Sequence, residues 1–368
     1  GASAAEVGLS NREGLSVTVR QREVETLEHN NDTGLGITVY FGQSKASSST
    51  SDLSEAAITE AVGAACNIAK HTQADEAAGL ADADLMATVF PELSLYHPWS
   101  IDVEKAIDLA TLCEQAGLDN DPRISNSEGA TVSSHTGQRV YANSHGFIGA
   151  TQSSRHSLSA TLIAQDARGM QRDYWYDIKR DANDLLSAES IGLKAAERTL
   201  SRLGAGEVKT GSYPVIFTAQ MAPSLFGQLI SAIRGGALYR KASFLLDKKG
   251  EQIFPEFIHV HEQPHILKAL GSASFDGEGV ATQNRDIILD GVLQGYVLDS
   301  YAARRLGLQT TGNAGGVHNL TIDSSTDADL AALIKKIDKG INVTRTMGHE
   351  GNIVNGDYAK GAARVGVE

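Results

Sequence analysis

Apolar and polar side chains alternate along much of the first half of the chain. Residues 15–41 alternate around turn signals such as those at 30–32, which predicts three short strands of an antiparallel meander. Residues 123–164 alternate in the same way, with turn residues at 136–138, and we expect hairpins there. An aromatic-rich strand is predicted over residues 170–178. Consecutive antiparallel strands therefore dominate this half of the chain.

Other segments repeat apolar residues every three or four positions, which predicts amphipathic helices. The first begins near Asp52 and Glu55, whose spacing matches a capping box. The others are expected over residues 100–116, 187–203 and 326–339. Strands followed by a helix occur twice, over 15–70 and 123–203, which suggests an internal duplication. This order favours an α+β fold over a doubly wound parallel sheet.

The second half of the chain centres on an apolar stripe that begins at Pro223. A proline in the first turn loses no helical hydrogen bond, and the stripe predicts a helix over residues 223–233. Gly235 and Gly236 predict the end of this helix, either as a C-cap or as a point of close backbone approach. A buried strand is expected at 213–217.

These patterns predict two domains. Residues 1–205 are expected to form an N-terminal α+β domain of repeated strand–helix units on antiparallel sheets. Residues 206–368 are expected to form a β-rich C-terminal domain around the central helix. The segment 74–98 is rich in acids and prolines, and we expect a surface connection there.

Composition narrows the classes of function. The chain has 368 residues, 41% of them hydrophobic, which can supply a sizeable core, and its net charge of −13 opposes direct binding of nucleic acid. Cys66 and Cys113 lie in helical patterns and are predicted to be buried thiols, which favours a reducing cytosol. No apolar run reaches the roughly 18 residues that cross a bilayer, and no signal-peptide pattern is present. We expect a cytoplasmic protein that does not contact membranes.

Residues 261–265, HEQPH, match the zinc-peptidase pattern H-E-x-x-H. That pattern holds a metal only on a continuous helix that presents both histidines on one face. The preceding residues 257–260 are typical of a strand, and Pro264 disfavours helical geometry just before it. We therefore expect a loop that leads into a short helix over residues 266–270. An independent metallopeptidase remains an alternative, and it would use His261, Glu262 and His265.

Glycine-rich segments offer a different kind of site. Residues 312–316 lack the Lys-Ser/Thr of a phosphate-binding P-loop, so a nucleotide site is not expected. Exposed backbone N–H and C=O groups in such segments can instead pair with an extended peptide as an added strand. We expect a peptide-binding lining that includes Gly235, Gly236, Gly315 and Gly316.

Five blocks of the sequence resemble the TldD/PmbA family of peptidases (peptidase U62-like), and more closely its PmbA (TldE) branch. They are SEGATVSSHTGQRVYANSHG, GGALYRKASFLLD, TQNRDIILDGVL, TTGNAGGVHN and NGDYAKGAA. The resemblance runs from about residue 15 to residue 363. In the TldD branch the helix that corresponds to residues 223–233 carries His-Glu-x-x-x-His. The two histidines bind zinc, and the glutamate accepts a proton from the zinc-bound water. Residues 226–233 hold no histidine, acid or cysteine.

The resemblance therefore implies a non-catalytic, peptide-binding subunit of a cytosolic zinc-metallopeptidase complex. This chain is expected to hold no catalytic residue and no metal ligand, and the zinc is expected in a TldD-like partner. The implied substrates are peptide precursors or unfolded small proteins such as antitoxins. Family members have also been called modulators of DNA gyrase, so a stand-alone homodimer acting on a toxin- or gyrase-linked partner is an alternative. The family continues past the GDYAKGAA block, so the C-terminal domain is expected to be incomplete.

Overall fold

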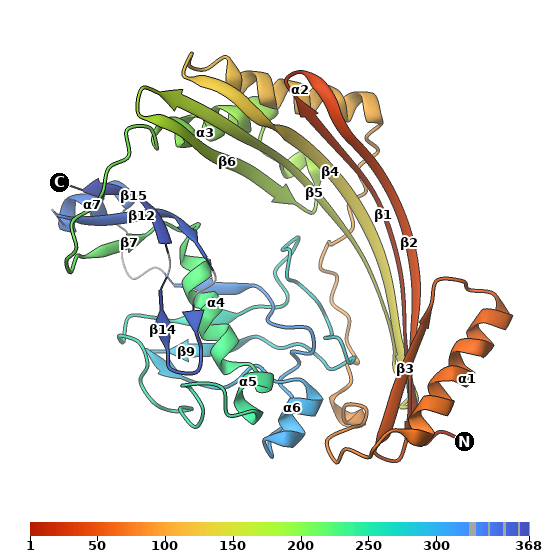
Figure 1. Cartoon of the computed structure of the whole chain (residues 1–368). Coiled ribbons are helices and arrows are strands. Elements are labelled where there is room, and N and C mark those ends of the chain that lie inside the picture. Colours follow the sequence, from red (N-terminus) through yellow and green to blue (C-terminus); the bar gives the residue numbers. More distant parts are fainter. Residues whose placement is uncertain (324–328, 338, 349–350, 360, 368) are drawn as a thin grey trace. The chain divides into compact units, whose positions relative to one another are not determined.

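A computed structural model covers the chain (Figure 1) and describes residues 1–323, 329–337, 339–348, 351–359 and 361–367. The chain forms two compact units. The first comprises Gly1–Leu80, Phe90–Gly206 and Ile266–Ser272, and the second comprises Ala81–Val89, Glu207–His265 and Ala273–Glu368. Each unit therefore includes one short segment that is distant in sequence from the rest of that unit.

The first unit is built on one six-stranded antiparallel sheet in the order β3-β2-β1-β4-β5-β6. Its strands are β1 (Ala4–Arg20), β2 (Glu23–Phe41), β3 (Ser44–Thr50), β4 (Ile124–Asn143), β5 (Ile148–Asp166) and β6 (Gly169–Lys179). The two strand groups predicted from the sequence join through the pairing of β1 with β4. The predicted α+β class with antiparallel sheets is confirmed.

The three short strands predicted over residues 15–41 are wrong, because β1 and β2 are two long strands that pair along their length. The turn expected at 30–32 lies inside β2, where Asn31 pairs with Glu13 of β1. The first ten residues of β2 are all exposed, so neither face of this part of the strand is buried. Main-chain pairing, which the side-chain pattern does not report, fixes this part of the strand.

Three helices flank the sheet. They are α1 (Glu55–His71), α2 (Val103–Leu118) and α3 (Ala188–Leu200). The predicted capping box at Asp52 is wrong, because Ser54 is the N-cap of α1 and the Asp52 carboxylate accepts the Ser54 N–H at 2.8 Å. Asp102 caps α2 and Ser187 caps α3, so each helix begins where a side-chain oxygen satisfies a free N–H.

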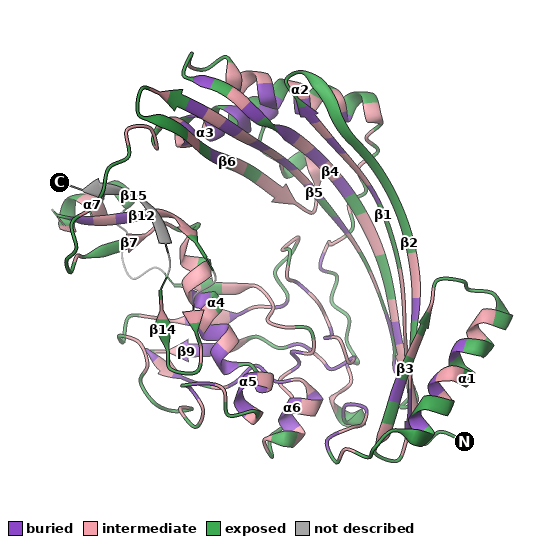
Figure 2. Ribbon diagram, viewed as in Figure 1, coloured by how far each residue is buried: buried purple, intermediate pink, exposed green. Residues whose placement is uncertain are grey.

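The main core of this unit lies between the sheet and the pair α2 and α3 (Figure 2). The two helices pack closely, because a Cβ added to Gly192 of α3 would clash with the carbonyl oxygen of Cys113 in α2. Burial raises the pKa of the Cys113 thiol to about 12. The buried-thiol prediction is correct for Cys113 but wrong for Cys66, which is partly exposed on α1.

The predicted surface connection over residues 74–98 is partly wrong. It contains a short 3-10 helix, Ala83–Leu85, and several small apolar residues that are buried. The N–H of Ala87 donates to the Gly279 carbonyl at 2.9 Å, and the N–H of Ala281 donates to the Leu85 carbonyl at 3.0 Å. These bonds attach the segment 81–89 to the second unit.

The second unit has short strands around a central helix, as predicted. One sheet has the order β10-β9-β8-β11 and another β15-β12-β7. The strands are β7 (Val215–Phe217), β8 (Val260–Glu262), β9 (Arg285–Leu289), β10 (Val292–Leu293), β11 (Leu320–Ile322), β12 (Gly340–Met347), β13 (Gly351–Asn352), β14 (Asp357–Tyr358) and β15 (Gly361–Val367). The helices are α4 (Ala222–Ile233), α5 (Gly235–Tyr239), α6 (Ser300–Arg305) and α7 (Leu330–Ile337).

The last helix predicted from the sequence, over residues 326–339, corresponds to α7. Its expected N-cap, Thr326, lies outside the described residues. Among the helices of the described part of the chain, none has the length and apolar content that a bilayer crossing requires.

Candidate functional site

The resemblance places the metal ligands of the TldD branch on the helix that corresponds to α4. Its apolar residues Phe226, Leu229, Ile230 and Ile233 are buried in the core of the second unit, which explains why this segment is helical. Its polar side chains are Ser224, Gln228 and Ser231, and the Ser231 hydroxyl donates to the Gly227 carbonyl at 2.8 Å. Zinc in proteins is held by imidazole, thiolate or carboxylate. The donor set of α4 therefore does not fit a zinc ion.

The β13–β14 hairpin covers part of α4. The Tyr358 hydroxyl lies 3.2 Å from the Ser224 hydroxyl, and a Cβ added to Gly351 would clash with the Gln228 side chain. Between the hairpin and the helix is a cavity of about 140 Å³. Its lining is mainly apolar and includes Leu225, Leu229, Phe244, Phe254 and Ile353.

Gly235 and Gly236 do not form the predicted C-cap. Arg234 ends α4 with extended backbone at φ −69° and ψ 137°, and the two glycines open α5. The alternative, a close backbone approach, is correct for Gly235, because a Cβ there would clash with the Cβ of Ala302 in α6. The Gly235 N–H donates to the Val297 carbonyl at 2.9 Å, so it is already used within the chain.

Gly315 and Gly316 lie in a loop whose backbone requires glycine, with φ of +105° and +128°. The Gly316 N–H donates to the Asn313 carbonyl at 2.9 Å. The carboxylate of Asp276 accepts the Ala314 N–H at 2.9 Å and so fixes the position of the loop. Burial raises the pKa of Asp276. Of the four predicted lining glycines, Gly235 and Gly316 therefore have N–H groups that an added peptide strand could not use.

The two glycine segments lie near each other. The Arg234 side chain, just before Gly235, comes within 3.8 Å of the position that a Cβ would take on Gly316. Arg234 is exposed, as is Gly315, while Gly236 is partly exposed. A lining formed by these segments would therefore present one guanidinium group beside two accessible glycines.

The motif HEQPH does not form a helix. His261 and Glu262 end strand β8 and point to opposite faces, with side-chain exposures of 27% and 2%. His265 Nε2 lies 3.1 Å from the Thr282 hydroxyl. The helix predicted over residues 266–270 is wrong, because the chain makes turns there and the Ala273 N–H donates to the Pro264 carbonyl at 3.0 Å. The three residues do not converge on one metal position, so this geometry does not support the independent metallopeptidase.

Glu262 is the centre of a buried hydrogen-bond network that the sequence did not reveal. Its Oε2 accepts from Arg285 Nε at 2.7 Å, and its Oε1 accepts from Asn313 Nδ2 and from the His318 N–H, each at 2.7 Å. Arg285 also donates to Asn313 Oδ1 at 2.8 Å and to the Tyr296 carbonyl at 2.8 Å. Glu262 therefore fixes the glycine loop that contains Gly315 and Gly316.

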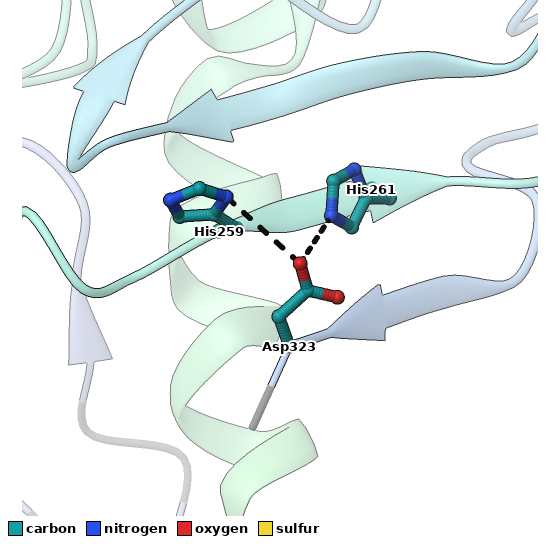
Figure 3. Close-up of side chains that lie close together, drawn as sticks. All are labelled: His259, His261 and Asp323. Carbon is teal, nitrogen blue, oxygen red and sulfur yellow. Dashed lines mark hydrogen bonds and ion pairs between the residues drawn. The ribbon is translucent and has the colours of Figure 1, made fainter. Parts of the chain in front are cut away.

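Within the described residues, one group of side chains could hold a metal ion, and it lies on the other face of β8 (Figure 3). His261 Nε2 is 2.9 Å and His259 Nδ1 is 3.9 Å from Asp323 Oδ2. His261 Nδ1 is 2.6 Å from Asp286 Oδ1, and His259 Nε2 is 2.9 Å from Asp290 Oδ1. A hydrogen bond to Asp323, and a smaller contribution from the hydrogen bond to Asp286, raise the pKa of His261.

The family models that match the chain describe a metallopeptidase, whereas its central helix α4 carries no zinc ligand. Three family models match in succession: PmbA/TldA metallopeptidase domain 1 over residues 5–69, the central domain over 96–203 and the C-terminal domain over 210–368. The chain belongs to the PmbA/TldD metallopeptidase family.

Individual relatives agree with this assignment. A metalloprotease PmbA homologue of Haemophilus influenzae is 47% identical over 366 residues, which cover 100% of this chain and 81% of the relative. A metalloprotease TldD homologue of the same organism is 26% identical over 226 residues, 58% of this chain and 46% of the relative. A crystal structure from Bacteroides thetaiotaomicron, described as a modulator of DNA gyrase, has a TM-score of 0.94 at 31% identity and covers 100% of this chain and 84% of that one. The predicted likeness to the PmbA branch is confirmed.

Proposed function

We propose that this chain is a peptide-binding subunit of a metallopeptidase complex in which a TldD-like partner supplies the catalytic zinc. The main support for the proposal is the set of polar side chains on α4. They are hydroxyl and amide groups, whereas a zinc peptidase needs imidazole and carboxylate groups on the corresponding helix. A partner from the same family is supported by the family's inclusion of TldD-type proteins. In this proposal the chain itself holds no catalytic metal.

The proposed substrates are extended segments of peptide precursors or of unfolded small proteins such as antitoxins. The glycine segments support this choice, because Gly236 and Gly315 combine accessible backbone with the neighbouring guanidinium group of Arg234. The net charge of −13 argues against direct contact with nucleic acid. A cytoplasmic location is part of the proposal, since Cys66 and Cys113 are both free thiols.

Co-expression with a TldD-like chain tests the subunit role. The expected result is a stable mixed complex that cleaves an unstructured peptide in a chelator-sensitive way, with no cleavage by this chain alone. If this chain alone cleaves the peptide and loses activity with chelator, the proposal is wrong. If it forms only homodimers and never a mixed complex, the alternative of a stand-alone binding protein is favoured instead.

A second experiment tests the peptide lining in the mixed complex. G236V would place a branched side chain in the lining, and the nearest atoms to that new Cβ are the flexible guanidinium nitrogens of Arg240 at 3.5 Å. G227V is the matched control, because Gly227 is exposed on α4 and an added Cβ meets nothing within 4 Å. Fluorescence anisotropy with a labelled extended peptide should show weaker binding for G236V and unchanged binding for G227V. Equal affinities for the two variants would exclude this lining.

A further inference from the structure

Strand β8 and its two neighbours place a set of ligand-type side chains on one face of a sheet. His259 and His261 are two positions apart, so their side chains share a face, while Val260 between them is fully buried. In the ladder His261 is opposite Asp286 of β9, and the N–H of Asp323 donates to the His259 carbonyl at 3.2 Å beyond the end of β11. The convergence of these side chains is therefore a consequence of strand pairing.

We propose that His259, His261 and Asp323 form a binding site for a divalent transition-metal ion, with Zn²⁺ as the best-suited ion. The ligand atoms are His259 Nδ1, His261 Nε2 and Asp323 Oδ2, which all lie within 4.8 Å of one another. Two imidazoles and one carboxylate are a ligand set that zinc uses in proteins, with ligand distances of about 2.0–2.2 Å and water in the fourth position.

The outer carboxylates are the second observation that points to a metal. The nitrogen of each imidazole that faces away from Asp323 has its own carboxylate, Asp290 for His259 and Asp286 for His261. This carboxylate–histidine arrangement orients a metal-bound imidazole and makes it a stronger ligand. A chance ion pair would involve only one histidine and one acid, whereas here each of the two rings has its own outer carboxylate.

The three-ligand set leaves a fourth position open, as in catalytic zinc sites, but the carboxylates around it are engaged elsewhere. A hydrolytic zinc needs a carboxylate that accepts a proton from the bound water. Asp286 and Asp290 are each within hydrogen-bonding distance of an imidazole nitrogen, and Glu262 points to the opposite face and bonds Arg285. The ion would instead cross-link the end of β11 to β8. Because all three ligands belong to this chain, binding of the ion would not require the partner subunit of the proposed function.

Zinc titration of the full chain by calorimetry, without any partner, tests the site. The wild type should bind about one equivalent, and H261A or D323N should lose this binding. D286N removes only an outer carboxylate, so its affinity should fall about 10–100-fold. The matched control is H145A, which removes an exposed histidine in the turn between β4 and β5 and should bind like the wild type.

A second measurement guards against misfolding of the variants. In the wild type, zinc should slow hydrogen–deuterium exchange in β8 and β11 and leave the first unit unchanged. The proposal is overturned if the wild type shows no saturable binding, or if binding persists in a variant lacking both His259 and His261. Either result would identify the cluster as an ion-pair network only, and neither would affect the co-expression test of the proposed function.

Discussion

The substitution E262Q separates two interpretations of the HEQPH segment. If Glu262 were the proton acceptor of a zinc peptidase, glutamine would abolish activity and leave the fold intact. In the structure Glu262 is 1% exposed and accepts three hydrogen bonds, one of them from the charged Arg285. We therefore expect E262Q to lower the stability of the second unit.

The magnitude follows from the donors around the two carboxylate oxygens. All three partners are N–H donors: Arg285 on Oε2, and Asn313 and the His318 main chain on Oε1. A glutamine amide has one acceptor oxygen, so either orientation points its NH₂ group at a donor. Removing one member of a buried ion pair costs about 3–5 kcal/mol, because the remaining charge stays buried. We expect a loss of that size in the second unit.

Hydrogen–deuterium exchange is a suitable assay, because both tryptophans, Trp99 and Trp175, belong to the first unit and do not report on the second. A loss of about 3–5 kcal/mol should speed exchange in β8 and in the 312–318 loop by about 10²- to 4 × 10³-fold. The control is E251Q, which breaks only the exposed pair of Glu251 with Lys248, worth about 0–1 kcal/mol. Wild-type exchange rates in E262Q would refute the reasoning.

Two further predictions concern packing and pH. G235V should destabilise the second unit by about 1–3 kcal/mol through overpacking against α6, while G227V on the open face of α4 should cost clearly less, as measured by thermal unfolding. Lys268 lies 2.9 Å from Asp181 and lowers the pKa of that carboxyl from its ordinary 3.8 to about 2. The pair therefore stabilises the first unit above about pH 4 and loses this contribution as the pH falls toward 2. The stability difference between wild type and D181N should shrink over that range, and a constant difference would contradict this.

The sequence predicted the class of fold because helices and half-buried strands have distinct apolar periods. It failed where the period carries no information. The first ten residues of β2 are exposed throughout, so only main-chain pairing defines them. The capping error has a local origin, since Asp52 and Ser54 are both good cap residues and only the backbone direction selects Ser54.

The candidate sites were predicted unevenly for a related reason. The absence of metal ligands on α4 follows from the sequence of that one segment, because a helix places residues four positions apart next to each other. The His259–His261–Asp323 group is not visible in this way, since Asp323 is 62 residues from His261 and only the pairing of β8 with β11 unites them. The available signal was His-x-His in a predicted strand, and the H-E-x-x-H pattern that overlaps it obscured that signal.

Alternation along β8 divides the HEQPH segment into two independent parts. His261 on the outer face belongs to the carboxylate cluster, and Glu262 on the inner face anchors the loop of Gly315 and Gly316. In a helical H-E-x-x-H site the two residues serve one ion, so both substitutions abolish the same activity. Here H261A should remove metal binding and leave the glycine loop ordered, whereas E262Q should disorder the loop. Separate effects from adjacent residues are expected of a strand, whereas loss of the same activity in both variants would require residues 261–265 to form a helix, which they do not.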